Sequence, residues 1–273
     1  MILITGAGGK TGRAVIRALV SKGETVRALV HLPDQIKSVE SLGVHAALAG
    51  DMNSSSMMDR AVQGVHAIYH ICPNVSPDEL SIGQTAIAAA RKAGVEHFVF
   101  HSVLHPQAES MPHHWQKLRI EEQLFESGLA YTILQPAVYM QNILVHWKTI
   151  LNEGTYPVPY SVETRLSYVD LEDVAQVAAM VLTESGHEHA IYELVGTPGL
   201  SQSEVAGILN QKLGRPVQAI SVPIETWERN ARQSGLVDYQ VETLIKMFRY
   251  YQRCGLYGNP QVLCLLLLHP PTT

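Results

Sequence analysis

Two groups of residues in this sequence have types and spacings that could do chemistry. The first is "TGAGGKTG", in which Gly6, Gly9 and Gly12 recur at every third position. Glycines at this spacing let the chain turn tightly and let a pyrophosphate approach the backbone, while a following helix offers free N–H groups to phosphate. The second is "PHHWQKL", which places His113 and Lys117 one helical turn apart. That spacing fits a catalytic pair, half of a metal site or an ordinary solvated helix surface.

The elements around these groups follow a regular alternation. The apolar runs "MILIT", "TVRALVH", "VHAALAG", "VHAIYHI", "HFVFHSV" and "YTILQP" predict strands, and helical patterns separate them. Strands that are almost uninterruptedly apolar are typical of a parallel sheet covered on both faces. The glycine loop lies between the first strand and the first helix. The sequence therefore predicts an α/β fold with a doubly wound parallel sheet of the Rossmann type.

The rhythm changes after Pro136, where "YPVPY" carries two prolines and predicts a loop. We expect a Rossmann domain made of residues 1–135 and 164–196. Residues 136–163 and 197–273 are expected to form a smaller, mainly helical substrate-binding region. Because no low-complexity linker separates the two, the smaller region is predicted to be interwoven with the larger one.

Composition excludes several classes of protein. The 273 residues carry a net charge of −5 with no basic stripe, so direct nucleic-acid binding is not expected. The longest apolar run, "VLCLLLL", is too short to cross a bilayer. Three widely spaced cysteines indicate reduced thiols, and the first residues read as a buried strand rather than a signal peptide. We expect a cytoplasmic protein, monomeric or homodimeric, that acts on a small molecule.

The residues near the second strand bear on which dinucleotide would bind. NAD sites usually have an acidic residue at the end of that strand, where it bonds the ribose hydroxyls. Here His31 occupies that place, and Asp34 comes three residues later. Lys10 and Arg13 lie in or beside the glycine loop, and a 2′-phosphate would be attracted by Lys10 and by His31 when protonated. The sequence therefore favours NADP(H) over NAD(H).

Five stretches together resemble the NmrA-like family of atypical short-chain dehydrogenase/reductases: "ITGAGGKTG", "VRALVHLP", "GVEHFVFHS", "YTILQPAVYMQN" and "YVDLEDVAQVAA". The resemblance implies that a dinucleotide lies along the carboxyl ends of the strands, with substrate beyond it. The cofactor-binding residues expected on this basis are Gly6, Gly9, Lys10, Thr11, Gly12, His31, Asp51, Met52, Ile71, Cys72, Pro73, Lys117 and Pro136. Tyr139 and Asn142 are implied to face the substrate.

The resemblance also bears on catalysis. Ordinary short-chain reductases use a Tyr-x-x-x-Lys pair after the fifth strand, but this chain has His113 at the tyrosine position, with Lys117 and Ser102 in place. By resemblance Lys117 binds the nicotinamide ribose, and His113 assists protonation with Ser102, because an imidazolium can donate a proton near neutral pH.

The leading hypothesis is an NADP(H)-dependent oxidoreductase that reduces a small apolar or aromatic carbonyl or quinone-like compound. The missing tyrosine motivates an alternative, a non-catalytic NADP(H)-binding redox sensor with a protein partner. A third reading is an enzyme like the nucleotide-sugar epimerases.

A metal site is the remaining interpretation of the histidines. His101, His105, His113 and His114 cluster around a loop, but no acidic third ligand stands out, so no metal is expected. His105 and His114 are expected in a loop and on the helix surface, respectively.

Overall fold

The computed structural model describes residues 1–273, and at its centre lies a seven-stranded parallel sheet. Its strands in spatial order are β11 (Ala190–Leu194), β6 (Tyr131–Pro136), β5 (His97–His101), β4 (Ala67–His70), β1 (Ile2–Ile4), β2 (Val26–Val30) and β3 (Ala46–Ala49). The predicted parallel sheet is confirmed. The winding direction reverses between β1 and β4, and such a switch point opens a crevice at the carboxyl ends of the strands.

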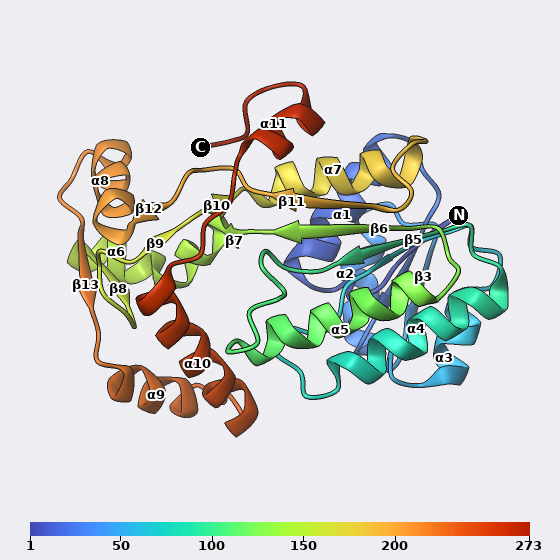
Figure 1. Cartoon of the computed structure of the whole chain (residues 1–273), viewed down its shortest axis with the longest axis horizontal. Coiled ribbons are helices and arrows are strands. Elements are labelled where there is room, and N and C mark those ends of the chain that lie inside the picture. The colour runs from blue at the N-terminus through green and yellow to red at the C-terminus, as the bar shows by residue number, and fades with distance from the viewer.

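Helices cover both faces of this sheet (Figure 1). One face carries α1 (Lys10–Ser21), the turn η1 (Pro33–Gln35), α2 (Ile36–Glu40) and α7 (Leu171–Thr183). The other carries α3 (Ser55–Ala61), α4 (Glu79–Ala93) and α5 (Pro112–Glu126). This double cover explains the apolar strands, because residues pointing to either side of the sheet enter a hydrophobic cluster.

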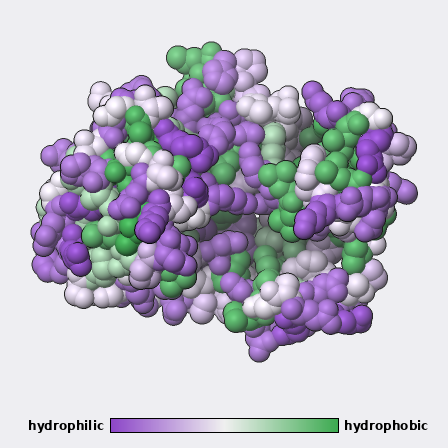
Figure 2. Space-filling model, turned by 180° about the vertical axis from the view of Figure 1, so that it is seen from behind, coloured by the Kyte–Doolittle hydropathy of each residue, from purple (hydrophilic) through white to green (hydrophobic).

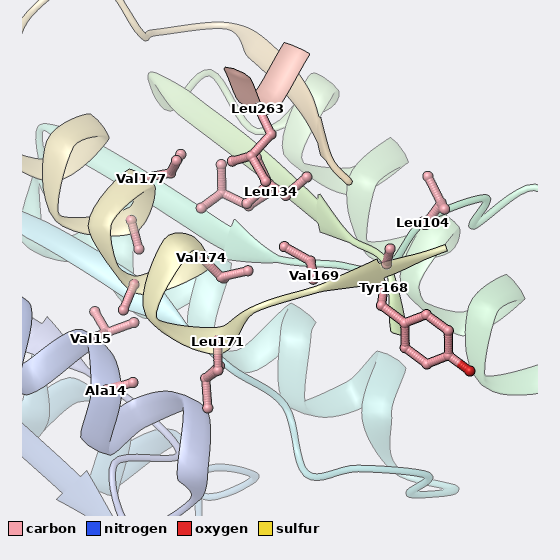
Figure 3. Close-up of a cluster of buried hydrophobic side chains, with 14 of the residues drawn as sticks. Ala14, Val15, Leu104, Leu134, Tyr168, Val169, Leu171, Val174, Val177 and Leu263 are labelled. Carbon is pink, nitrogen blue, oxygen red and sulfur yellow. The ribbon is translucent and has the colours of Figure 1, made fainter. Parts of the chain in front are cut away.

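The first helix shows how the sequence pattern produces this packing. Its apolar residues fall at intervals of three or four, so Val15 and its neighbours form one buried stripe. That stripe meets α7, whose Val174 and Val177 lie in the same cluster (Figure 3). Leu134 of β6 and Leu263, from near the end of the chain, complete the group. The cluster joins segments more than 240 positions apart in sequence, so it closes only when the whole chain has folded.

A smaller part follows β6 and lies beyond the carboxyl ends of the strands (Figure 1). Its elements are β7 (Val138–Tyr139), the 3₁₀ segment η2 (Met140–His146), α6 (Trp147–Glu153), β8 (Thr155–Val158), β9 (Arg165–Leu166), β10 (Tyr168–Val169), β12 (Leu200–Ser201), α8 (Gln202–Leu213), β13 (Gln218–Ser221), α9 (Ile224–Gln233) and α10 (Asp238–Cys254). None of the helices in the protein combines the length and hydrophobicity needed to cross a membrane.

The prediction that "YPVPY" is only a loop was wrong. Residues Thr155–Val158 form β8, which pairs in parallel with β13. Each strand of this two-stranded sheet has one neighbour, so Pro157 can lack an N–H without breaking a ladder on both sides. The partner strand lies about sixty residues later, and the local sequence gave no sign of it.

The chain passes between the two parts more than once. Helix α11 (Gln261–Leu267) packs against α7 and β11 rather than within the smaller part. Beyond it, the Thr272 N–H donates to Asp173 Oδ2 at 2.8 Å. The short strands β9 and β10 pair with β12 and β7 instead of joining the large sheet. The chain therefore crosses between the parts after β6, before α7, after β11 and before α11.

Candidate functional site

One cavity of about 890 Å³ lies between the carboxyl ends of the strands and the smaller part. Seen from behind, this side of the molecule is hollowed between the two parts, with hydrophobic atoms gathered in the hollow (Figure 2). The structure brings every residue predicted for the site to the wall of this cavity. These residues are Gly6, Gly9, Lys10, Thr11, Gly12, His31, Asp51, Met52, Ile71, Cys72, Pro73, Ser102, His113, Lys117, Pro136, Tyr139 and Asn142.

The glycine loop forms a cradle at the start of α1. Gly6 has a φ of +59°, a conformation that side chains other than glycine rarely adopt. A Cβ atom on Gly12 would lie 2.6 Å from the Gly6 carbonyl oxygen, so only glycine lets α1 start this close to β1. The helix then begins after Gly9 with no side chain capping it and no acidic residue in its first turn. Its N-terminal N–H groups and positive dipole end suit a diphosphate.

The opposite wall of the crevice comes from the end of β4. The hydroxyl of Thr5 receives a hydrogen bond from the Ile71 N–H at 2.9 Å and lies 3.0 Å from His70 Nδ1, which ties β1 to β4. His70 Nε2 lies 3.3 Å from Cys72 Sγ. Burial, with a smaller effect of Lys117, lowers the pKa of His70 to about 3, and burial also raises the pKa of Cys72. Both groups are therefore uncharged at neutral pH and act as structural partners.

The end of the cavity near β2 and β3 is polar and more exposed. His31, Asp51 and Met52 line it, and Asp51 Oδ1 accepts a hydrogen bond from the Asn53 N–H at 2.9 Å. Close by, Arg13 Nη1 donates to Ser38 Oγ at 2.6 Å and thereby crosses from α1 to α2. Arg13 is therefore held against α2 and is not among the residues that line the cavity, whereas His31 is.

On α5, His113 and Lys117 share one face as predicted, but Lys117 has a partner that the spacing did not reveal. Lys117 Nζ donates to Glu79 Oε1 at 2.5 Å, and the two side chains are 13% and 1% exposed. Burial acts to lower the pKa of Lys117, but the Glu79 carboxylate outweighs it and the pKa is raised. Burial raises the pKa of Glu79, and Lys117 opposes that shift.

His113 differs from its predicted state. Burial, reinforced by Lys117, lowers its pKa to about 4, and its Nδ1 is buried with no hydrogen-bond partner. The expectation of an imidazolium near neutral pH was therefore wrong, because the helix start is covered rather than open to water. At pH 7 the ring is neutral and carries one N–H.

Ser102 follows β5 directly, as predicted. Its hydroxyl is already used as a hydrogen-bond donor within the protein. It donates a short hydrogen bond to Glu121, which is 2% exposed. Gln135 Nε2 donates to both oxygens of the same carboxylate, at 3.0 and 3.1 Å. Burial raises the pKa of Glu121, and these hydrogen bonds act against that shift. Ser102, Glu121 and Gln135 thus form a closed network that joins β5, α5 and β6.

Tyr139 stands at the other side of the strand ends. Its hydroxyl lies 2.6 Å from His101 Nε2 and receives a hydrogen bond from Thr11 Oγ1 at 3.4 Å. His101 Nδ1 in turn lies 2.6 Å from the hydroxyl of Tyr69. Lys10 Nζ is 5.1 Å from the centroid of the Tyr139 ring and donates to Asn142 Oδ1 at 2.5 Å. Lys10 therefore lies on the side of the glycine loop that faces β7 and η2.

The far lobe of the cavity is aromatic and uncharged. Trp227 and Phe248 meet edge to face with centroids 4.7 Å apart, and Tyr160 lies beside Phe248. Tyr156 and Tyr168 both donate their hydroxyl groups to Gln202 Oε1, at 3.3 and 2.9 Å. No Asp, Glu, Lys or Arg lines the cavity beyond Pro136. This lobe therefore offers ring surfaces rather than ionic partners.

The position of His114 corrects the sequence prediction. It is 1% exposed instead of lying on the surface, and its Nδ1 is 3.2 Å from the His105 carbonyl oxygen. The reason is that the loop before α5, which includes His105, covers this side of the helix. The protein contains no group of three or more His, Cys, Asp or Glu side chains arranged to hold a metal ion.

The comparisons with known proteins agree with this geometry. The model of the NmrA-like family matches residues 1–265. The chain belongs to the NmrA-like family. An NAD(P)H azoreductase from Xenophilus azovorans is 31% identical over 91% of this chain and 86% of its own length.

Solved structures of this family and fold extend the comparison. The NADPH-dependent quinone oxidoreductase of Escherichia coli, solved as a complex with NADPH, has a TM-score of 0.87 at 26% identity, covering 100% of this chain and 96% of the other. The Citrobacter triphenylmethane reductase, solved with NADP(H), has a TM-score of 0.85 at 22% identity over 99% and 96% of the two chains. At that identity the second likeness supports the Rossmann-type fold alone.

Several residues of this NmrA-like site were missed by reasoning from sequence. Glu79 and Glu121 were unassigned, His101 was considered only as a metal ligand, and Trp227 and Phe248 were not placed at the cavity. A glutamate in a helical stretch carries no local signal that it is buried or of which residue is its partner. For His101, the sequence did offer one sign that it belongs to the site: it directly precedes Ser102 at the end of a predicted strand.

Proposed function

We propose that the protein is an NADP(H)-dependent reductase of small aromatic carbonyl, quinone-like or dye-like compounds. The observation that carries this proposal is that one cavity joins a phosphate cradle to an uncharged aromatic lobe. The names of two relatives, an NAD(P)H azoreductase and a quinone oxidoreductase, support the same class of substrate.

The residues present fit a nicotinamide dinucleotide. The close approach at Gly12 and the uncapped start of α1 suit the diphosphate. Asp51 and Met52 would flank the adenine, while Ile71, Cys72 and Pro73 would run beside the nicotinamide ribose. A 2′-phosphate would meet His31 at the cavity wall and Arg13 if that side chain turned from Ser38 toward it, and no acidic residue ends β2 to favour the NAD ribose. NADP(H) is therefore preferred over NAD(H).

Lys117 is proposed to hold the nicotinamide ribose. Its ammonium group lines the cavity, and Glu79 behind it keeps it charged and fixes its position. An ammonium has three donors, so Lys117 can bond a ribose hydroxyl while retaining Glu79. His113 lines the same wall one turn away and would contact the nicotinamide or the substrate as a neutral imidazole.

Substrate would lie in the aromatic lobe. Its ring faces favour a flat apolar compound, because aromatic pairs gain about 0.5–1.5 kcal/mol beyond their buried area. The phenol hydroxyls of Tyr156 and Tyr168 are engaged by Gln202, which leaves their rings to contact the ligand. A bound NADPH supplies a hydride to such a ligand. This chain then has to exclude water and provide one proton to the oxygen of the reduced product.

The direct test is oxidation of NADPH over a panel of quinones, aromatic aldehydes and azo dyes, followed by absorbance at the nicotinamide band. Turnover of at least one uncharged aromatic acceptor, with NADPH bound more tightly than NADH, is the expected result. Tight NADPH binding without turnover across the panel would contradict the proposal and favour the redox-sensor alternative. No observation in the structure favours the epimerase alternative.

A further inference from the structure

The proposed reductase needs a proton donor, and the groups expected to supply it are otherwise engaged. The Ser102 hydroxyl donates its hydrogen bond to Glu121. Lys117 is bound to Glu79 in a buried ion pair. His113 is neutral, and a neutral imidazole is a very weak acid. The inference below rests on the proposed function.

Tyr139 also lines the cavity, and its surroundings differ from those of Ser102, Lys117 and His113. Strand β7 places its ring beside the ends of β5 and β6, where its hydroxyl meets His101 Nε2 at 2.6 Å. Thr11, from the glycine loop, donates to the same oxygen at 3.4 Å. The phenol oxygen thus lies between the phosphate cradle and the strand end that would carry the nicotinamide.

The state of His101 determines which way the hydrogen bonds run. Burial, with a smaller effect of Lys117, lowers the pKa of His101 to about 3, so the ring carries a single N–H. If that proton is on Nε2, it is donated to Tyr139, and the fully buried Tyr69 donates its hydroxyl to Nδ1 at 2.6 Å. Tyr139 then accepts from His101 and Thr11, and its own O–H remains for an acceptor in the cavity.

We propose that Tyr139 is the proton donor to the substrate oxygen, and that His101 and Tyr69 are positioning residues that hold its hydroxyl. Hydride from NADPH adds to the conjugated carbonyl, and the electron pair of the C=O π bond moves to oxygen. The Tyr139 O–H bond breaks as the new O–H bond forms. The phenolate that remains recovers a proton from water after the product leaves the cavity.

Burial raises the pKa of Tyr139 and the hydrogen bond from Thr11 acts against that shift, so a transient phenolate depends on the groups that face its oxygen. With the His101 proton on Nε2, His101 from β5 and Thr11 from α1 both donate to its oxygen, and charge-assisted hydrogen bonds of this kind are stronger than neutral ones. Lys10, also from α1, places its ammonium 5.1 Å from the ring centroid. Tyr69, from β4, reaches the site only through His101 and carries no charge.

The test is single-turnover oxidation of bound NADPH by the fastest quinone of the panel, measured from pH 6 to pH 9 in Tyr139→Phe. General acid catalysis contributes about 10²–10⁴-fold, so we expect the hydride-transfer rate to fall on the order of 10²-fold. The affinity for NADPH should change less than about threefold. Because water or hydronium must then supply the proton, the variant rate should fall with rising pH where the wild-type rate is flat.

Two further variants separate the alternatives. Tyr69→Phe frees His101 Nδ1, and a partial loss of rate with the same NADPH affinity is expected. Tyr192→Phe removes a similar phenol–imidazole pair, 3.0 Å from His187 Nδ1 and away from the cavity, and should leave the rate unchanged.

A Tyr139→Phe protein with wild-type rate and a flat pH profile would overturn the inference. So would a larger loss and the new pH dependence in His113→Gln. Both results leave the proposed reductase intact, whereas absence of turnover in the wild-type protein would refute the proposed function itself.

Discussion

The buried pair of Lys117 and Glu79 makes a prediction about stability that does not depend on any ligand. At 2.5 Å and an effective dielectric constant of about 20, the two charges attract by about 7 kcal/mol, most of which offsets the cost of removing them from water. Removing one partner leaves the other charge buried and alone. Each single variant, Lys117→Met or Glu79→Gln, should therefore lose about 3–5 kcal/mol of unfolding free energy near neutral pH.

The two variants should respond to pH in opposite directions. In Lys117→Met, the buried Glu79 keeps its proton to a higher pH in the native state than in the unfolded chain. Since the native state then binds more protons, stability falls as pH rises above about 4. In Glu79→Gln, the buried Lys117 loses its proton at a lower pH in the native state than in the unfolded chain. The unfolded chain then binds more protons, so stability rises with pH toward about 10.

Urea unfolding followed by tryptophan fluorescence between pH 5 and pH 9, without nucleotide, measures both slopes. The double variant should recover most of the loss and show little slope, because no isolated charge remains buried. The exposed pair Arg17–Glu172, at 3.0 Å, is the matched control, and its disruption should cost about 0–1 kcal/mol. Slopes of the same sign in the two single variants, or losses no larger than in the control, would refute the reasoning.

Three further outcomes are expected. Gly12→Ala should weaken NADPH binding more than tenfold, as measured by fluorescence titration, because its Cβ would lie 2.6 Å from the Gly6 carbonyl oxygen. The control Gly207→Ala, at a position in α8 with open space for a Cβ, should leave NADPH binding unchanged. Arg13→Ala should raise the Kd for NADPH about 5- to 10-fold and leave that for NADH nearly unchanged, as expected for one charge-assisted contact to the 2′-phosphate; equal effects on both would contradict that assignment. A sulfonated naphthoquinone should have kcat/KM at least about tenfold below its uncharged parent, since the aromatic lobe has no cation to pair with it; comparable values would show that charge is tolerated there.

The sequence predicted those features that depend on neighbours along the chain. The position of the glycine loop between strand and helix, the apolar strands and the shared face of His113 and Lys117 all follow from local pattern. Since parallel strands align their carboxyl ends, the same pattern also brought the expected site residues to one cavity.

Features that depend on distant partners could not be predicted in this way. The charge state of His113 depends on how completely the surrounding chain covers it, and the orientation of Ser102 depends on Glu121. The strand β8 depends on β13, which follows only after α7 and α8. The wall made by Trp227 and Phe248 requires knowing that α9 and α10 fold back over the strand ends.

The repeated crossing of the chain between the two parts has a consequence for how this protein can be diversified. The aromatic lobe is assembled from two stretches separated by α7 and β11, and α11 returns to the large sheet after the second stretch. A single crossover between these stretches would replace only half of the wall and leave the β9–β12 pairing mismatched. New substrate preferences are therefore more accessible through point substitutions within the lobe than through exchange of whole modules.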